Sequence, residues 1–214
     1  MLHYPKIPDS RQAGHGRCVV FEKYDGTNLH WDWERDFGWH SFGTRRDAFN
    51  LTAQGIADFQ AKHDHLTETV TIFETTLADG CAEVFNTHPA YQMHPRFKIF
   101  AEFLGAHSFA GLHKNEDPKE LRLFDVEAEG FGLLGPQQFV RDFGHLPIAR
   151  VLYQGKFTGA LVEDVRRGRY NVAEGVICKG GSGGSDLWMV KIKTAAYLER
   201  LKQAFAERWE EYWE

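Results

Sequence analysis

The stretch Glu22-Lys23-Tyr24-Asp25-Gly26-Thr27-Asn28 ends a run of alternating β-branched, aromatic and polar residues. Asp25-Gly26 is a turn signal, so Lys23 is expected at the end of the first strand. A lysine in that place is either a solvated residue beside a hairpin turn or a nucleophile. The pattern K-x-D-G alone favours the solvated residue, because its three fixed letters occur by chance in roughly one of forty chains of this length.

Five further stretches change that balance, because they follow Lys23 in order and set charged or aromatic residues in strand-like runs. They are Ser41-Phe42-Gly43-Thr44-Arg45-Arg46, Phe100-Ala101-Glu102-Phe103-Leu104-Gly105, Leu123-Phe124-Asp125-Val126, Glu174-Gly175-Val176-Ile177-Cys178-Lys179 and Met189-Val190-Lys191-Ile192-Lys193. Taken singly, each has an ordinary interpretation as a solvent-facing carboxylate, a core aromatic or the polar face of a strand. Six matches in order are difficult to obtain from packing alone.

The pattern of apolar and turn residues predicts a mixed order of strands and helices. Strands are expected as a meander over 17–39 and at 97–103, 121–126, 149–153, 174–179 and 187–193, and helices at 47–66, 70–85, 135–143, 158–165 with a Thr158 cap, and from 197 to 209. The glycine-rich stretch 180–185 lacks the spacing of a phosphate loop and is expected to be a flexible hairpin turn.

Length and composition indicate one globular, intracellular domain. The chain has 214 residues and 43% hydrophobic residues, which is enough for a single mixed domain over 1–214. It has no apolar run long enough to cross a membrane and no secretory signal pattern, so a cytoplasmic location is expected. Cys18, Cys81 and Cys178 are too far apart for a zinc frame and are predicted to be buried or idle thiols.

The formal net charge of −5 requires any nucleic-acid-binding surface to be local. The candidates for a basic face are Arg45-Arg46, Arg166-Arg167-Arg169 and Lys191 with Lys193, opposed by the acidic tail Glu207, Glu210, Glu211 and Glu214. The histidines have no H-E-x-x-H or Cys/His spacing, so a histidine metal cluster is not expected.

The ordered series resembles motifs I, Ia, III, IIIa, IV and V of the covalent nucleotidyltransferases, which include DNA ligases, RNA ligases and mRNA capping enzymes. The resemblance spans 23–193. E-K-x-x-G-T-N, with Asn28 five residues after the lysine, looks like the RNA ligase 2 group and the RNA-editing ligases, and Tyr4-Pro5-Lys6-Ile7 resembles the start of that group. The resemblance implies an α+β nucleotidyltransferase domain of the ATP-grasp-like ligase kind, in which antiparallel sheets form an ATP cleft flanked by helices.

The same resemblance implies a role for each motif residue. Lys23 would take AMP from ATP and pass it to a 5′-phosphate, after which a 3′-hydroxyl would displace AMP. Glu102 would bind the ribose hydroxyls, and Phe124 would stack on the nucleoside. Asn28 and Arg45 would contact the ribose or phosphates, Glu22 would help to read adenine, and Glu174 would bind Mg²⁺ or Mn²⁺.

Elementary chemistry makes further demands on this set. A lysine must lose its proton before it can attack phosphorus, and an unperturbed lysine has a pKa of about 10.4. Nearby cations favour the neutral amine, so Lys191 and Lys193, two apart on a strand and therefore on one face, are expected beside Lys23, with Arg45 approaching. Transfer of a nucleotidyl group also needs Mg²⁺ held by one or two carboxylates and the substrate phosphates, and Glu174 is the best candidate.

The expected activity is therefore ATP-dependent RNA ligation through lysyl-AMP, on RNA or nicked duplex nucleic acid. Relatives carry a second domain after motif V, an OB-fold or a helical module, whereas about one helix follows Lys193 here. A partner protein or a homodimer is the expected substitute. The alternatives are a DNA ligase, a capping enzyme that uses GTP, and a non-catalytic nucleotide- or RNA-binding module.

Overall fold

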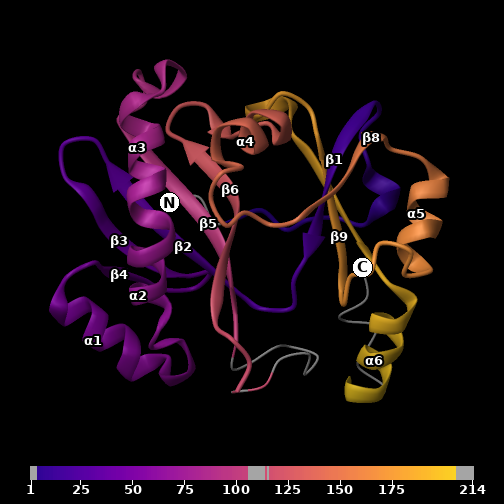
Figure 1. Cartoon of the computed structure of the whole chain (residues 1–214), viewed down its shortest axis with the longest axis horizontal. Coiled ribbons are helices and arrows are strands. Elements are labelled where there is room, and N and C mark those ends of the chain that lie inside the picture. The colour runs from indigo at the N-terminus through magenta and orange to yellow at the C-terminus, as the bar shows by residue number, and fades with distance from the viewer. Residues whose placement is uncertain (1–3, 106–113, 115, 206–214) are drawn as a thin grey trace.

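The computed structural model describes residues 4–105, 114 and 116–205, and it has two antiparallel sheets with helices on their outer sides (Figure 1). The six-stranded sheet has the order β4-β3-β2-β5-β6-β7 and contains β2 (Thr27–Glu34), β3 (Gly38–Thr44), β4 (Ala48–Asn50), β5 (Arg96–Leu104), β6 (Glu120–Ala128) and β7 (Gly132–Leu133). The four-stranded sheet has the order β10-β9-β1-β8 and contains β1 (Arg17–Lys23), β8 (Val151–Lys156), β9 (Gly175–Gly180) and β10 (Trp188–Lys193). This arrangement confirms the α+β class.

Helices cover the outer side of each sheet (Figure 1). They are α1 (Ala53–Lys62), α2 (Thr69–Phe73), α3 (Asp79–Thr87), α4 (Pro136–Phe143), α5 (Gly159–Arg166) and α6 (Ala195–Phe205). A π turn, Glu74–Ala78, joins α2 to α3. As Figure 1 shows, α1, α2 and α3 lie beside the six-stranded sheet, and α5 lies beside the four-stranded sheet. No helix in the described part of the chain is long and apolar enough to cross a membrane.

Alternation along the strands separates the core from the site. On β2, Leu29, Trp31 and Trp33 are buried in the main core under the helices, where the Trp31 ring stacks on Phe73 at 4.5 Å. Successive side chains of a strand point to opposite faces, so Asn28 and His30 point away from that core. The inner face of the six-stranded sheet is therefore polar and available for a site.

Strand β1 joins two cores. Phe21 belongs to the main core, where its ring lies 5.9 Å from that of Phe139 on α4, whereas Cys18 and Val20 pack in a second core beneath α5. Cys81 and Cys178 are also buried, and all three cysteines are free thiols, as predicted. The face of β1 that carries Phe21 therefore packs the four-stranded sheet against the rest of the protein, while the opposite face packs against α5.

The structure corrects two of the predicted elements. The expected meander over 17–39 is split, because β1 pairs with β8 and β9 while β2 and β3 belong to the other sheet. The region 47–66 begins as strand β4 before α1, because Phe49 pairs with Phe42 across the hairpin and its ring packs 5.4 Å from Phe59. The remaining predicted strands and helices occur within a few residues of their expected bounds.

The predicted turn over 180–185 connects β9 to β10 in a hairpin. The Asp186 carboxylate accepts hydrogen bonds from the Ser182 amide at 2.7 Å and from its hydroxyl at 2.8 Å, so this turn satisfies its own polar groups. The Thr158 side chain caps α5 by accepting from the Leu161 amide, as predicted. Trp209 and the four glutamates of the acidic tail lie outside the described residues.

Candidate active site

A cavity of about 470 Å³ lies where the two sheets face each other. All nine of the site residues predicted from the sequence line it, and they come from both sheets: Glu22, Lys23, Asn28, Arg45, Glu102, Phe124, Glu174, Lys191 and Lys193. Pockets of about 300–1,000 Å³ hold typical small ligands. The structure therefore brings the predicted residues together in a space of the right size for a nucleotide.

Strand register places the first part of the site. Lys23 on β1 and Lys193 on β10 both pair with Gly175 on the central strand β9, and Glu174 immediately precedes that glycine. The Lys23 Nζ atom lies 2.8 Å from the Glu174 carboxylate, which is almost wholly buried. Lys191 and Lys193 line the same cavity while Ile192 between them is in the second core, so the two lysines share a face as their spacing predicts.

The charge state of Lys23 differs from the sequence-based expectation. Burial lowers the pKa of the Lys23 amine, but the negative charges of Glu174 and Glu102 raise it by more, so the net pKa lies above its ordinary value. The prediction that surrounding cations keep this amine neutral is wrong for the nucleotide-free protein. Lys23 is instead an ammonium paired with Glu174, because the negative charges of Glu174 and Glu102 stabilise its protonated form.

The pKa of Lys193 is lowered, as was expected for Lys23. Burial lowers the pKa of Lys193 to about 8, and the positive charges of Lys23 and Lys191 act in the same direction against the charge of Glu174. Its Nζ atom lies 5.4 Å from the centre of the Tyr197 ring. The Tyr197 hydroxyl in turn donates to Asp25 at 3.0 Å, which ties α6 to the turn after Lys23.

Asn28 and Glu102 are direct partners in the six-stranded sheet, where β2 pairs with β5. Gly26 allows the chain to cross close to Glu102: a Cβ there would lie 2.3 Å from the Phe103 carbonyl oxygen, and the Gly26 amide donates to Glu102 Oε1 at 3.2 Å. Burial, with the charge of Glu174, raises the pKa of Glu102 to about 7. The Asn28 side-chain amide, which can donate and accept, thus lies next to the Glu102 carboxylate, which can accept. Such a pair suits the hydroxyls of a ribose.

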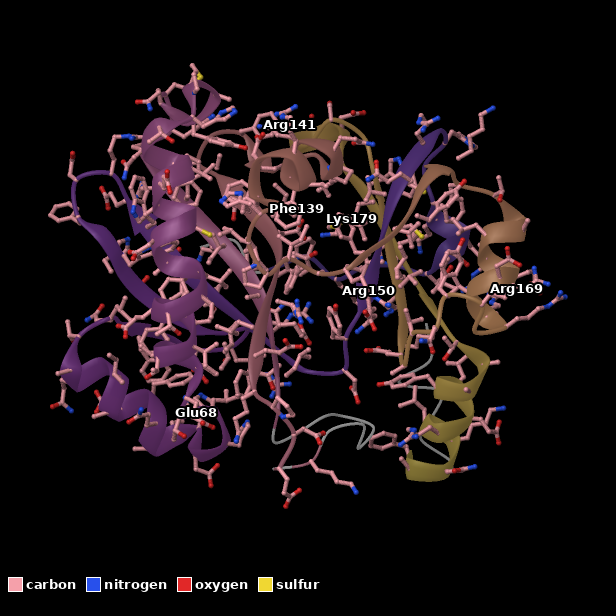
Figure 2. All side chains as sticks on the ribbon, viewed as in Figure 1. Glu68, Phe139, Arg141, Arg150, Arg169 and Lys179 are labelled. Atoms are coloured by element: carbon pink, nitrogen blue, oxygen red, sulfur yellow. The ribbon has the colours of Figure 1, made fainter. Side chains whose placement is uncertain are left out.

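Phe124 belongs to a buried cluster that sequence reasoning did not include. The ammonium of Lys179 lies 2.7 Å from the Asp125 carboxylate and donates to the Phe124 carbonyl oxygen at 2.8 Å. The Tyr4 hydroxyl donates to the same carboxylate, and its ring meets that of Phe124 edge to face at 5.1 Å. Figure 2 shows Lys179 in the interior between the sheets. Lys179 and Asp125 lie in the quoted motifs, but their spacing does not reveal that they pair.

Glu22 and Arg45 line the cavity with partners of their own. Arg150 donates from Nε to Glu22 at 2.9 Å and from its other end to the Asn171 carbonyl oxygen at 3.0 Å, so the Glu22 carboxylate is held in place. Arg45 donates to the Tyr4 carbonyl oxygen at 3.4 Å. Arg150 follows no motif and was not predicted, because 128 residues separate it from Glu22.

The donor set fits a divalent cation that is held mainly by its substrate. The described residues contain no group of three or more His, Cys, Asp or Glu side chains placed to hold a metal ion. Mg²⁺ is commonly bound by one or two carboxylates together with substrate phosphates. Glu174 offers one buried carboxylate at the cavity wall, beside the lysines expected to bind those phosphates.

The three arginines at and after the end of α5, Arg166, Arg167 and Arg169, do not line the cavity. Arg169 pairs with Asp164 at 2.9 Å, and Arg166 and Arg167 lie near Glu163. Figure 2 shows Arg169 at the outer edge of the molecule, beyond the end of α5. Of the three predicted basic groups, only those of β10 and of the turn after β3 reach the cavity.

Comparison with solved structures shows the fold. An archaeal ATP-dependent RNA ligase matches in two forms, with TM-scores of 0.57 and 0.58, identities of 15% and 16%, and coverage of 96% and 99% of this chain but 52% and 55% of that chain. A mutant of Naegleria gruberi RNA ligase with AMP and Mn matches with a TM-score of 0.60 and 15% identity over 93% of this chain and 58% of that chain.

No family model and no curated protein sequence matches the chain. The chain spans little more than half the length of the ligases that it resembles. At 15–17% identity the likeness is one of fold. This chain therefore shares the fold of ATP-dependent RNA ligases.

Proposed function

We propose that this chain is an adenylyltransferase of the ATP-dependent RNA ligase type, with Lys23 as the residue that carries AMP. The observation that carries the proposal is the convergence of Lys23, Glu174 and Lys193 at one point of the four-stranded sheet, inside a cavity that also contains Phe124 and Glu102. The fold shared with RNA ligases supports it. Packing alone does not explain a partly buried lysine beside a buried glutamate and a second buried lysine.

The proposed first step forms a bond between the Lys23 nitrogen and the α-phosphorus of ATP. The bond from that phosphorus to the bridging oxygen of the β-phosphate breaks, and pyrophosphate leaves. Lys23 must first lose a proton to solvent and leave its pairing with Glu174. Glu174 would hold Mg²⁺ or Mn²⁺, which would supply positive charge to the phosphates, and Lys191, Lys193 and Arg45 would bind phosphate oxygens.

Two further steps complete the proposed reaction. A 5′-phosphate oxygen of RNA attacks the lysyl-AMP phosphorus, the N–P bond breaks, and Lys23 recovers its proton. A 3′-hydroxyl then attacks the 5′-phosphate and loses its proton to solvent, AMP leaves and the strand is sealed. Throughout, Phe124 would stack on adenine, Glu22 held by Arg150 would accept from its amino group, and Glu102 with Asn28 would bind the ribose.

The direct test is the mass of the protein after incubation with ATP and Mg²⁺. The expected result is a gain of one AMP on the peptide that holds Lys23, lost on acid treatment and absent in Lys23→Ala. Lys156→Ala, which removes an exposed lysine of β8, serves as the matched control and should retain the adduct. An adduct that persists in Lys23→Ala would refute the proposal.

Parallel incubations separate the alternatives. An adduct with GTP instead of ATP would indicate a capping-type enzyme, and sealing of DNA-ended but not RNA-ended nicks would indicate a DNA ligase. Sealing should also be assayed across protein concentrations and separately from adduct formation, because the chain spans only part of the ligases that it resembles. If a second copy of this chain, rather than a partner protein, completes the nucleic-acid-binding surface, the sealing rate should depend steeply on protein concentration.

A further inference from the structure

Arg150 does not line the nucleotide cavity, but it is bonded to a residue that does. Its guanidinium donates from Nε to the Glu22 carboxylate at 2.9 Å and from its far nitrogen to the Asn171 carbonyl oxygen at 3.0 Å. Glu22 belongs to the wall of the cavity. Figure 2 shows Arg150 near the middle of the molecule. The shortest route from Arg150 to a bound nucleotide therefore passes through Glu22.

An irregularity in the pairing of β1 with β8 brings Arg150 opposite Glu22. Phe21 pairs with Val151, and Leu152 is skipped. The Glu22 amide then donates to the Arg150 carbonyl oxygen at 2.9 Å. In an unbroken register Val151 would stand opposite Glu22, and its apolar side chain could not pair with a carboxylate. A bulge of this kind re-aims a side chain, and bulges are frequent beside active sites.

Tyr24 completes a network around the Glu22 carboxylate. The Tyr24 hydroxyl accepts from the Arg150 amide at 3.3 Å. Burial raises the pKa of Tyr24, and the charge of Glu22 and a hydrogen bond to its carboxylate act in the same direction. The hydroxyl therefore keeps its proton and donates to Glu22. Arg150 thus positions Glu22 directly through its guanidinium and also through the phenol that its backbone holds.

The bond to Asn171 fixes the direction of the guanidinium. Within the part of the chain that the structure describes, Asn171 is the only residue other than glycine with a left-handed backbone, at φ 49°. Asn tolerates that conformation better than most residues. The Asn171 amide also donates to the Gly168 carbonyl oxygen at 3.2 Å, so the turn after α5 is itself held. Two separate nitrogens of Arg150 therefore bond to two fixed acceptors, which the single nitrogen of a lysine could not do.

A carboxylate held in this way suits adenine better than guanine. A carboxylate can only accept hydrogen bonds. The 6-amino group of adenine donates, whereas guanine has an acceptor oxygen at that position and donates from N1 and from its 2-amino group. A carboxylate with both oxygens free could accept from the two guanine donors at once. Because Arg150 takes one oxygen of Glu22, the other is left as a single acceptor, which matches the amino group of adenine.

We infer that Arg150 is a positioning residue that makes the nucleotide site selective for adenine over guanine by fixing the Glu22 carboxylate. The inference rests on the proposed function for the presence of a purine nucleotide in the cavity. A pair that only stabilised the fold would have a different signature, because its loss would weaken adenine and guanine nucleotides equally. The ratio of the two affinities therefore distinguishes positioning from stabilisation.

The test measures binding without chemistry. Analogues of ATP and GTP with a methylene group in place of the oxygen between the α- and β-phosphates do not transfer their nucleotide, and each is titrated by calorimetry with Mg²⁺. Arg150→Met is expected to lower the wild-type preference for the adenine analogue by about tenfold. Arg150→Lys should restore part of the preference. The control is Arg96→Met, which breaks an exposed pair with Glu129 outside the cavity and should keep the wild-type ratio.

Two further measurements show whether Arg150 acts through Glu22. An adenine nucleotide analogue that lacks the 6-amino group should bind the wild type more weakly than its parent, and Arg150→Met should reduce that difference. In the Glu22→Gln background, adding Arg150→Met should change the ratio by less than about twofold, because residues that act through one contact are not additive. A full tenfold change in that background would overturn the inference. So would a wild type without preference for adenine, or an Arg150→Met protein with the wild-type ratio.

Formation of the AMP adduct on Lys23 is measured separately with ATP itself. A protein that forms no lysyl-AMP but loses its preference for adenine in Arg150→Met would contradict the proposed function and keep the inference. A protein that forms lysyl-AMP while Arg150→Met leaves the ratio unchanged would keep the function and contradict the inference. Thermal melting of each variant shows that the proteins compared are folded.

Discussion

The ammonium of Lys179 on β9 lies 2.7 Å from the carboxylate of Asp125 on β6, so a buried ion pair joins the two sheets across the base of the cavity. Both side chains are almost wholly inaccessible to solvent. The Tyr4 hydroxyl donates to the same carboxylate, and the Phe124 carbonyl oxygen accepts from Lys179. This pair fixes the relative position of the walls that carry Lys23 and Phe124.

Removing one member of this pair should destabilise the protein strongly. Lys179→Met leaves the Asp125 charge buried without its cation, so a loss of about 3–5 kcal/mol in the free energy of unfolding is expected. Urea denaturation followed by fluorescence measures it. The control is Glu129→Gln, which breaks an exposed pair with Arg96 and should leave the free energy of unfolding nearly unchanged. Equal costs for the two variants would show that the sheets are not joined in this way.

Breaking the pairing of Lys23 should make its amine more reactive. Glu174 and Glu102 hold the pKa of Lys23 above its ordinary value, so Glu174→Gln should lower that pKa and increase the neutral fraction at a given pH. Acetylation of Lys23 without nucleotide or metal should then be faster, by about tenfold for each unit of pKa. Peptide mass spectrometry measures the rate, with exposed Lys202 as the internal control. Unchanged acetylation of Lys23 would mean that Glu174 does not control its protonation.

The same variant should nevertheless form less lysyl-AMP. Glu174 is the proposed metal ligand, and removal of its charge is expected to lower the rate of adduct formation with ATP by about a hundredfold or more. Rapid-quench sampling of the AMP adduct at saturating ATP and Mg²⁺ measures this rate. If Lys23 in Glu174→Gln is acetylated faster than in the wild type but forms the AMP adduct at the wild-type rate, Glu174 takes no part in the chemistry.

Binding of ATP should depend on pH through Lys193. Its pKa of about 8 means that the free protein has the ammonium below that pH and loses it above. The affinity for ATP should therefore be highest at neutral pH. It should fall by up to about tenfold as the pH rises above 8, because one charged contact to phosphate is lost. Lys193→Arg keeps its charge over this range, so its affinity should vary much less. The same pH dependence in both proteins would assign the titration to another group.

Stacking on Phe124 should contribute most of the affinity for the nucleobase. Phe124→Ala is expected to weaken ATP binding by about 1–3 kcal/mol, the usual loss when an aromatic platform for a base is removed. Phe124→Tyr keeps the ring and should bind nearly as well. Phe37→Ala removes a ring that is 76% exposed and serves as the control. Fluorescence titration with ATP distinguishes these results, and a normal affinity in Phe124→Ala would place the base elsewhere.

Much of the secondary structure and the set of residues around the cavity could be predicted from the sequence. Glu174 to Lys179 and Met189 to Lys193 alternate in a way that predicts strands, and the two form adjacent strands with both lysines of β10 on one face. The stretch around Lys23 predicts a strand followed by a turn, and both are present. Such features depend on neighbours in sequence, so local pattern is sufficient to find them.

Other features depended on residues far apart in the chain. Local pattern could not show that β1 leaves the meander to join β8 and β9, because the choice of partner strand is made by packing of both faces of β1. The Glu22–Arg150 and Asp125–Lys179 pairs were hidden for the same reason. A smaller pocket of about 180 Å³ likewise forms because the turn after β3 lies beside β2 and β5.

The sequence by itself determined the elements and the chemical groups that surround the cavity, because strand periodicity and residue type are properties of short stretches. Only the tertiary structure decided the charge state of Lys23. A pKa depends on burial and on distance to other charges, and the register of β1 and β9 brought a buried carboxylate to 2.8 Å from the amine where the sequence suggested cations.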